Sequence, residues 1–276
     1  MFAFMLFLYP MKALVAISLI IILTGCSNYN QVLKSDDYTQ KFAMANALYD
    51  KGQYARSVAL FEQVYQRMPK STEGEVAYYR LGKAFYYEED WYMASYYLSA
   101  FPLRFPFSPK CEEALFLSAL CAVENSPEPS LDQSETELAL NELQLFVNRY
   151  PQSALVDTCN LVMDKLRFKL ETKDVLNVRL YQRTENYRAA TISAASFLES
   201  YPISTYREEV AAILLRNSYL LTINSISTKL QERIDQTRER YADFLAEFPE
   251  SSYLREFDSY LEKLSAIEVP STTSSN

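Results

Sequence analysis

The chain has 276 residues, of which 49% are apolar, and it carries 35 acidic and 27 basic residues. Only 4 glycines stand beside 22 tyrosines, which argues against a turn-rich β protein and favours helices. A net charge of −8 without a run of Lys and Arg makes nucleic acid and anionic lipid surfaces poor partners.

The N-terminal segment has the form of a secretory signal. Lys12 precedes an apolar run of 11 residues, Ala13–Leu23, and small residues follow. The run is too short to span a bilayer, which takes roughly 20 apolar residues. Because residues 1–10 carry no positive charge, we expect translation to start at Met11 and residues 1–25 to form a signal peptide.

The signal ends in Leu-Thr-Gly-Cys26, which resembles the lipobox of bacterial lipoproteins. In such proteins the chain is cut before the cysteine, so the resemblance implies acylation of Cys26 and stable anchoring by several acyl chains. Ser27 follows at a position where aspartate often marks inner-membrane retention, and we therefore expect the outer membrane. The alternative is an ordinary signal peptide with a chance cysteine. Cleavage would remove Lys12 and leave a charge of 26 − 35 = −9.

A short motif, a large apolar residue followed by Pro-x-Ser, occurs five times. Proline ends a helix, and a serine two residues later can cap the next helix. A period of this size indicates stacked supersecondary units. The motif is therefore interpreted as the joint of a helical solenoid, with the apolar residue packed under the turn. The prolines are Pro69, Pro106, Pro151, Pro202 and Pro249, spaced 37, 45, 51 and 47 residues apart.

Between the joints, apolar and small residues recur at the helical spacing of three and four. The first two units each contain a short break, Lys51–Tyr54 and Glu88–Trp91, between two helical stretches. The third unit is interrupted by a Pro/Ser-rich loop over Glu124–Ser134. This pattern resembles the tetratricopeptide repeat, in which small residues lie where paired helices touch and a proline closes the unit.

The C-terminal units are less regular. We expect a helix over Ala154–Glu171, another over Asp174–Arg183 and a third from Tyr206 to about Leu221. The predicted fold is all-α, a right-handed superhelical solenoid of about five tetratricopeptide-like helix pairs. After the signal peptide, the predicted segments are a lipidated tether over 26–37, repeats 1–3 over 38–151, repeats 4–5 over 152–265 and a disordered tail over 266–276.

Nothing in the sequence indicates catalysis, a cofactor or a metal site. With no histidine, a Ser-His-Asp triad, a Cys-His pair and an HExxH zinc site are impossible. Cys111, Cys121 and Cys159 have spacings of 10 and 38 that fit no zinc pattern, and we expect buried free thiols. Phosphate-binding glycine motifs are absent, and the paired carboxylates lie on amphipathic helices as solvated faces. We therefore expect that the protein is not an enzyme.

Aromatic residues crowd between Tyr78 and Tyr97. In repeat solenoids of this type the first helix of each pair lines a groove, and tyrosine combines an apolar body with a polar tip, which suits extended peptide. The alternative is that these aromatics pack between repeats. The groove candidates are Phe42, Asn46, Tyr49, Tyr79, Lys83, Tyr86, Tyr87 and Phe116.

The order of lipobox, short tether and five helix pairs closed by Pro-x-Ser is similar to the BamD family, lipoproteins of the outer-membrane β-barrel assembly machinery. The similarity runs from Cys26 to about Leu264 and includes the stretch YYEEDWYMASYYLSAFPLRFPFSP. It implies a non-enzymatic scaffold on the periplasmic face of the outer membrane. Its C-terminal repeats would bind the periplasmic domains of the barrel-forming subunit BamA, and its N-terminal groove would bind unfolded outer-membrane proteins.

Three basic residues near the C-terminus, Lys229, Arg233 and Arg238, are candidates for the partner interface, and a solvated helix face is the alternative. Two other binding functions stay open. One is a tetratricopeptide adaptor for peptidoglycan or division machinery, although such adaptors often carry a coiled-coil arm and no heptad run occurs here. The other is a SusD-like glycan-binding lipoprotein, although those chains are much longer and insert loops between repeats.

Overall fold

The computed structural model describes residues 28–267 of the chain. The expected signal peptide, the start at Met11, Cys26 and most of the expected tail lie outside the described residues. Within 28–267 every regular element is a helix, which confirms the predicted all-α fold of tetratricopeptide-like helix pairs. None of the helices in this range is long and apolar enough to cross a membrane.

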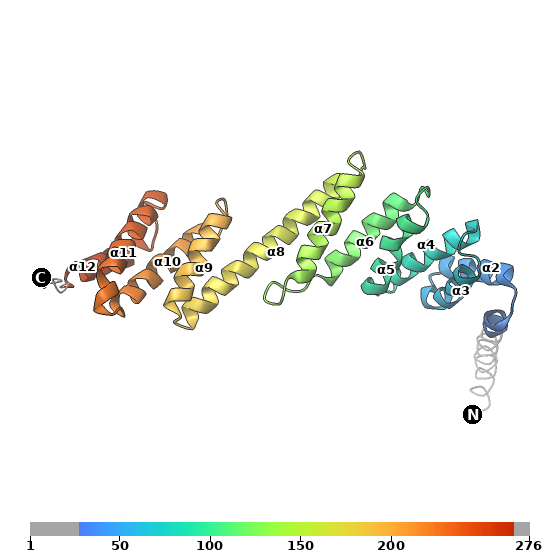
Figure 1. Cartoon of the computed structure of the whole chain (residues 1–276), viewed down its shortest axis with the longest axis horizontal. Coiled ribbons are helices and arrows are strands. Elements are labelled where there is room, and N and C mark those ends of the chain that lie inside the picture. Colours follow the sequence, from blue (N-terminus) through green and yellow to red (C-terminus); the bar gives the residue numbers. More distant parts are fainter. Residues whose placement is uncertain (1–27, 268–276) are drawn as a thin grey trace, which may run out of the picture. The chain divides into compact units, whose positions relative to one another are not determined.

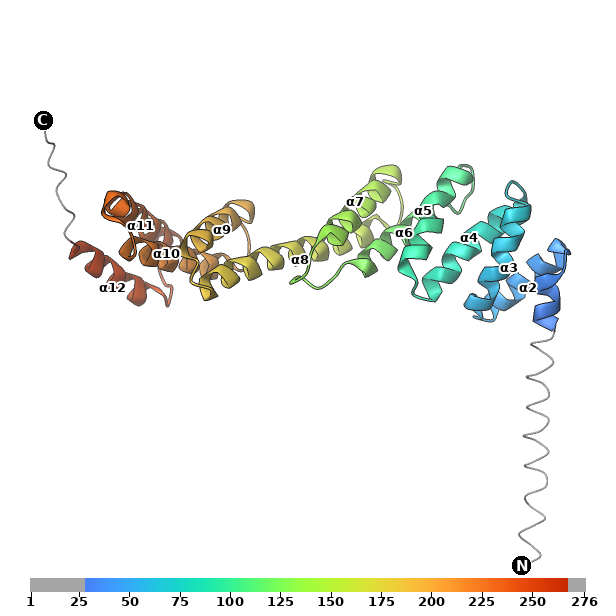
Figure 2. The same ribbon diagram turned by 60° about the horizontal axis from the view of Figure 1, so that its bottom comes forward.

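The chain divides into two compact units, and α8 (Val156–Arg183) contributes to both. Unit 1 contains residues up to 127 together with 133–163, and unit 2 contains 128–132 together with residues from 164. Within each unit, consecutive helices pack against one another in chain order (Figure 1; Figure 2). Unit 1 contains α2 (Tyr38–Asp50), α3 (Tyr54–Arg67), α4 (Thr72–Tyr87), α5 (Trp91–Arg104), α6 (Cys111–Asn125) and α7 (Ser134–Arg149). Unit 2 contains α9 (Tyr187–Ser200), α10 (Arg207–Ile223), α11 (Ser227–Glu247) and α12 (Leu254–Ser265).

The five Pro-x-Ser joints share one backbone geometry. Each apolar residue before the proline ends a helix with φ between −124° and −130° and ψ between 54° and 69°. This conformation lies outside the α region, which a following proline disfavours. At four joints its ring contacts a buried phenylalanine four residues earlier, as in the Phe197–Tyr201 pair with centroids 4.8 Å apart. The predicted packing under the turn is therefore confirmed at these four joints.

The role of the joint serine differs from the prediction at most joints. Ser71 is the N-cap of α4 and accepts a hydrogen bond from the Gly74 N–H at 3.0 Å. At the other four joints the serine hydroxyl accepts from the N–H two residues later, and the helix begins one residue after that. Some of these hydroxyls also donate a hydrogen bond to a carboxylate of the preceding repeat. Ser108 donates to Glu75 at 2.7 Å, and Ser153 donates to Glu112 at 2.5 Å.

The expected pair of helices over 154–171 and 174–183 is one continuous helix, α8. The prediction was wrong because no proline or glycine stands between the two stretches. Thr172 instead donates its hydroxyl to the Phe168 carbonyl at 2.8 Å, a bond that forms within a helix. Val175 and Val178 are fully buried and continue the apolar face into unit 2.

The described part of the expected tether is also helical and packs on the first helix pair. Residues 28–34 form helix, and Val32 is buried. The Tyr29 hydroxyl donates to the Arg56 carbonyl at 3.0 Å, and Lys41 Nζ donates to the Leu33 carbonyl at 2.9 Å. This segment is thus part of unit 1 and not a free linker.

The three predicted free thiols, Cys111, Cys121 and Cys159, are all buried and unpaired. Burial raises the pKa of Cys121 to about 12, so its thiol stays protonated at neutral pH. These cysteines contribute to packing as small apolar residues.

Candidate functional site

Four of the eight groove candidates form a connected cluster of side chains on α2 and α4, here called the aromatic strip: Tyr49, Tyr79, Lys83 and Tyr87. The last three are spaced by four residues and share one face of α4. Lys83 Nζ lies 5.4 Å from the Tyr79 ring centroid and 5.9 Å from that of Tyr87. The Tyr49 ring lies 6.2 Å from the Tyr87 ring, which joins α2 to α4.

A fourth aromatic residue, Tyr54, extends the strip although sequence reasoning missed it. Its ring stacks on Tyr87 with centroids 4.7 Å apart and meets Tyr49 at 5.2 Å. Tyr54 begins α3, and the turn at Gly52, with φ 73°, brings it back across the end of α2. Burial raises the pKa of Tyr49 well above its ordinary value, so its hydroxyl is a neutral hydrogen-bonding group.

Among the groove candidates, the Tyr79 hydroxyl lies beside the Glu113 carboxylate, whereas the buried side-chain oxygen of Asn46 lacks a hydrogen-bond partner in the described chain. Such an atom costs free energy when left unpaired. Tyr79 is only 5% exposed, and burial raises its pKa, with the nearby Glu113 carboxylate adding to the rise. Glu113 itself accepts from Lys83 at 2.7 Å, which ties α4 to α6. The strip therefore combines aromatic rings with one cation that is paired with a carboxylate.

The remaining aromatic groove candidates pack against neighbouring elements. Phe42 lies against the core cluster that contains Val32. The Tyr86 ring meets Trp91 at 5.3 Å, and the Phe116 ring meets Phe146 of α7 at 5.6 Å. The structure therefore shows these three side chains in packing contacts, as the alternative interpretation expects.

The partner-interface candidates lie on α11 but in different surroundings. Lys229 pairs with Glu232 at 2.9 Å, and Arg238 lies 3.9 Å from Asp235, with about half of each basic side chain exposed. Arg233 instead donates to the Leu221 carbonyl at 3.2 Å and to Ser225 Oγ at 2.7 Å. Arg233 thus satisfies one carbonyl near the C-terminal end of α10.

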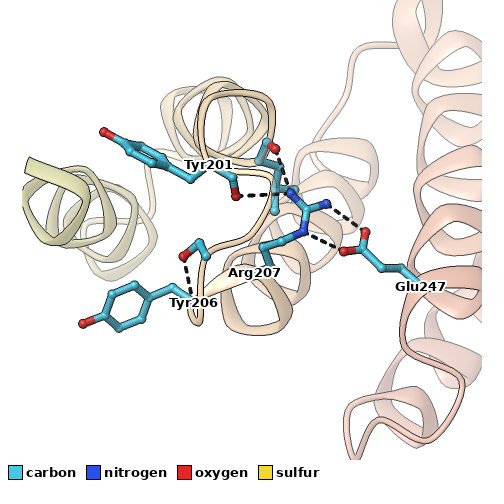
Figure 3. Close-up of polar contacts among 6 residues, drawn as sticks. Tyr201, Tyr206, Arg207 and Glu247 are labelled. Carbon is cyan, nitrogen blue, oxygen red and sulfur yellow. Dashed lines mark hydrogen bonds and ion pairs between the residues drawn. The ribbon is translucent and has the colours of Figure 1, made fainter. Parts of the chain in front are cut away.

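In unit 2 the most extensive polar contact centres on Arg207 at the start of α10. Its Nε and Nη2 donate to the Glu247 carboxylate at 2.7 and 3.0 Å (Figure 3). Its Nη1 donates to the Leu198 carbonyl at 2.8 Å and to the Tyr201 carbonyl at 3.4 Å. One guanidinium therefore joins the C-terminal end of α9 to α11. Within the described residues, no group of three His, Cys, Asp or Glu side chains is placed to hold a metal ion.

Comparison with known proteins connects this arrangement to one family. A sequence model of the YfiO family, described as "Outer membrane lipoprotein", matches residues 34–233. A relative from Caulobacter vibrioides is named "Outer membrane protein assembly factor BamD" and is 26% identical to this chain. The aligned region covers 62% of this chain and only 56% of the relative's length. A relative of the same name from Neisseria meningitidis serogroup B is 27% identical. The aligned region covers 74% of this chain and 82% of that relative's length.

Solved structures add less. A crystal structure of a putative kinesin light chain with nearly identical TPR-like repeats from Podosopora anserina is 13% identical, and the match covers 77% of this chain and 96% of that one. Its TM-score of 0.32 is low, so the assignment of tetratricopeptide-like pairs rests on the helices and joints of this chain.

Proposed function

The chain belongs to the YfiO family of outer membrane lipoproteins, and from this membership we propose that it is a non-enzymatic scaffold for the assembly of outer-membrane proteins. The match over residues 34–233 carries the proposal, because it includes the whole aromatic strip and a large part of unit 2. The two relatives named as outer membrane protein assembly factors support the same role.

We propose that the protein is acylated at Cys26 and held on the periplasmic face of the outer membrane. The lipobox before Cys26 and the description of the family support this anchor. Mass spectrometry of the N-terminal peptide should find the acyl groups. Cys26→Ser should move the protein out of the membrane fraction, and its retention there would contradict the proposal.

We propose two binding surfaces for this scaffold. Exposed basic side chains of α11, with Lys229 and Arg238 as candidates, would bind the periplasmic domains of a BamA-like subunit. The aromatic strip would bind extended segments of unfolded outer-membrane proteins. Tyrosine rings supply contact area together with a polar tip.

A pull-down in mild detergent, with a tagged chain that keeps Cys26, tests the assembly role. We expect near-stoichiometric recovery of a large barrel protein with periplasmic repeat domains. Recovery of division proteins would favour the cell-envelope adaptor, and recovery of a nutrient transporter would favour glycan capture. Either of these results, or recovery of no protein, would overturn the proposal.

A further inference from the structure

The joints give the two units a common register, so that equivalent positions can be compared. Tyr78 lies seven residues after the joint serine Ser71, and Ala211 lies seven residues after Ser204. Tyr97 and Arg240 each lie nine residues before a joint proline. The α3–α4–α5 and α9–α10–α11 arrangements thus place different side chains at matched positions.

In unit 1 tyrosines fill the space between α3, α4 and α5. The Tyr78 ring lies 4.5 Å from the Tyr65 ring and 5.2 Å from the Tyr97 ring. Arg104 donates to the Tyr78 hydroxyl at 3.0 Å and to the Tyr65 hydroxyl at 2.7 Å. The cavity that remains there has a volume of about 220 Å³. The side chains of unit 1 itself therefore occupy most of this space, and Arg104 is engaged by two tyrosine hydroxyls.

In unit 2 the matched positions leave the space open. Leu198 stands where unit 1 has Tyr65, and Ala211 stands where it has Tyr78. The resulting cavity has a volume of about 540 Å³. Phe244, Leu214 and Ala211 form apolar walls. Charged groups line the same cavity: Arg207, Arg240, Asp243 and Glu247.

Arg240 differs from its neighbour Arg207 in how its charge is compensated. Arg207 uses Nε, Nη1 and Nη2 for Glu247 and backbone carbonyls. Arg240 donates from Nη1 to Ser218 Oγ, and no carboxylate in the described part of the chain forms an ion pair with it. Partial burial disfavours this charge and lowers the pKa of Arg240. A carboxylate beside it would restore the missing compensation.

We propose that this cavity binds an extended segment of a protein partner that inserts an Asp or Glu side chain beside Arg240 and an apolar side chain against Phe244 and Leu214. The volume suits such an occupant, because the matched space in unit 1 holds side chains of the chain itself. Arg240 and Phe244 lie beyond residue 233, where the family match ends, whereas Leu214 on the opposite wall lies within the matched region. The cavity is separate from the aromatic strip and the exposed Lys229.

Two capped fluorescent hexapeptides test the site, identical except that one carries a glutamate between two leucines and the other a glutamine. With the full chain in mild detergent, we expect the glutamate peptide to bind about tenfold more tightly, and Arg240→Gln to remove this preference. Ala211→Tyr, which copies the residue of unit 1, should block both peptides. Arg255→Gln changes an exposed arginine of α12 outside the cavity and should preserve the preference.

Thermal melts of each variant confirm folding, and Arg240→Gln keeps the test valid if Ala211→Tyr fails to fold. Equal affinity for the two peptides would overturn the proposal. A preference that survives Arg240→Gln, or the absence of binding by either peptide at millimolar concentration, would overturn it as well.

Discussion

The guanidinium of Arg216 in α10 forms two hydrogen bonds of 2.7 Å with the carboxylate of Glu256 in α12. The Tyr260 hydroxyl donates to the same carboxylate, and its ring stacks on Tyr219 with centroids 4.0 Å apart. Both charged side chains are partly shielded from solvent, with exposed fractions of 23% and 35%. The final helix is thus attached to α10 by a bidentate ion pair beside an aromatic stack.

Glu256→Gln should lower the free energy of unfolding by about 1 kcal/mol at pH 7, because the pair is partly shielded and bidentate. The hydrogen bonds from Arg216 lower the pKa of Glu256 below its ordinary value of 4.5. A carboxyl with a lowered pKa in the folded state contributes stability above its unfolded pKa and loses it as pH falls through the folded value. The difference in the free energy of unfolding between the unmodified chain and Glu256→Gln should therefore shrink below pH 4.5. Urea denaturation at several pH values measures it, with the exposed Glu262→Gln as the matched control.

Glu89→Gly should raise the free energy of unfolding by about 0.5–1 kcal/mol, since Glu89 has a φ of 60° and a residue without Cβ adopts this region without strain. Gly52 has the equivalent conformation, φ 73°, in the turn of the first unit. Glu88→Gly should act in the opposite direction, because Glu88 has a negative φ and accepts from the Ala55 N–H at 3.1 Å. Denaturation midpoints of the two variants would contradict this account if both moved the same way.

Gly74→Ala should destabilise the protein by about 2 kcal/mol or more, although alanine is normally the better helix former. A Cβ on Gly74 would lie 1.9 Å from the Met68 carbonyl oxygen, which belongs to the backbone of the first joint. A Cβ on Gly82 would meet Leu98 side-chain atoms at 2.9 Å, which can shift. Thermal melts should therefore rank Gly82→Ala as the milder substitution, and the reverse order would show that the joint backbone yields more easily than the Leu98 side chain.

Tyr87→Ala should weaken binding of a peptide from the C-terminus of an outer-membrane protein by about tenfold, because it removes the ring that joins Tyr49, Tyr54 and Lys83. Tyr87 is 46% exposed, so the loss of thermal stability should be small. Fluorescence anisotropy with the labelled peptide measures the affinity. Tyr92→Ala, at a tyrosine 66% exposed on α5, is the matched control. Equal effects of the two variants would count against the strip as the binding surface.

The sequence by itself determined the features that depend on neighbouring residues. Proline disfavours the α region for the residue before it, so all five joints could be located as helix ends. Apolar spacing of three and four determined the helices, and the buried free thiols followed from their position in those helices. The continuity of α8 was missed because a local dip in the apolar pattern does not break a helix that has no proline or glycine.

Only the tertiary structure decided which side chains meet across elements. Tyr54 joins the aromatic strip through the turn at Gly52, whereas Phe116 faces α7. The cavity beside Arg240 depends on Ala211, a small residue that the sequence pattern did not single out. Such contacts depend on the summed volumes and directions of side chains from three helices. Helical periodicity specifies the face on which a residue lies but not whether the opposing space is filled.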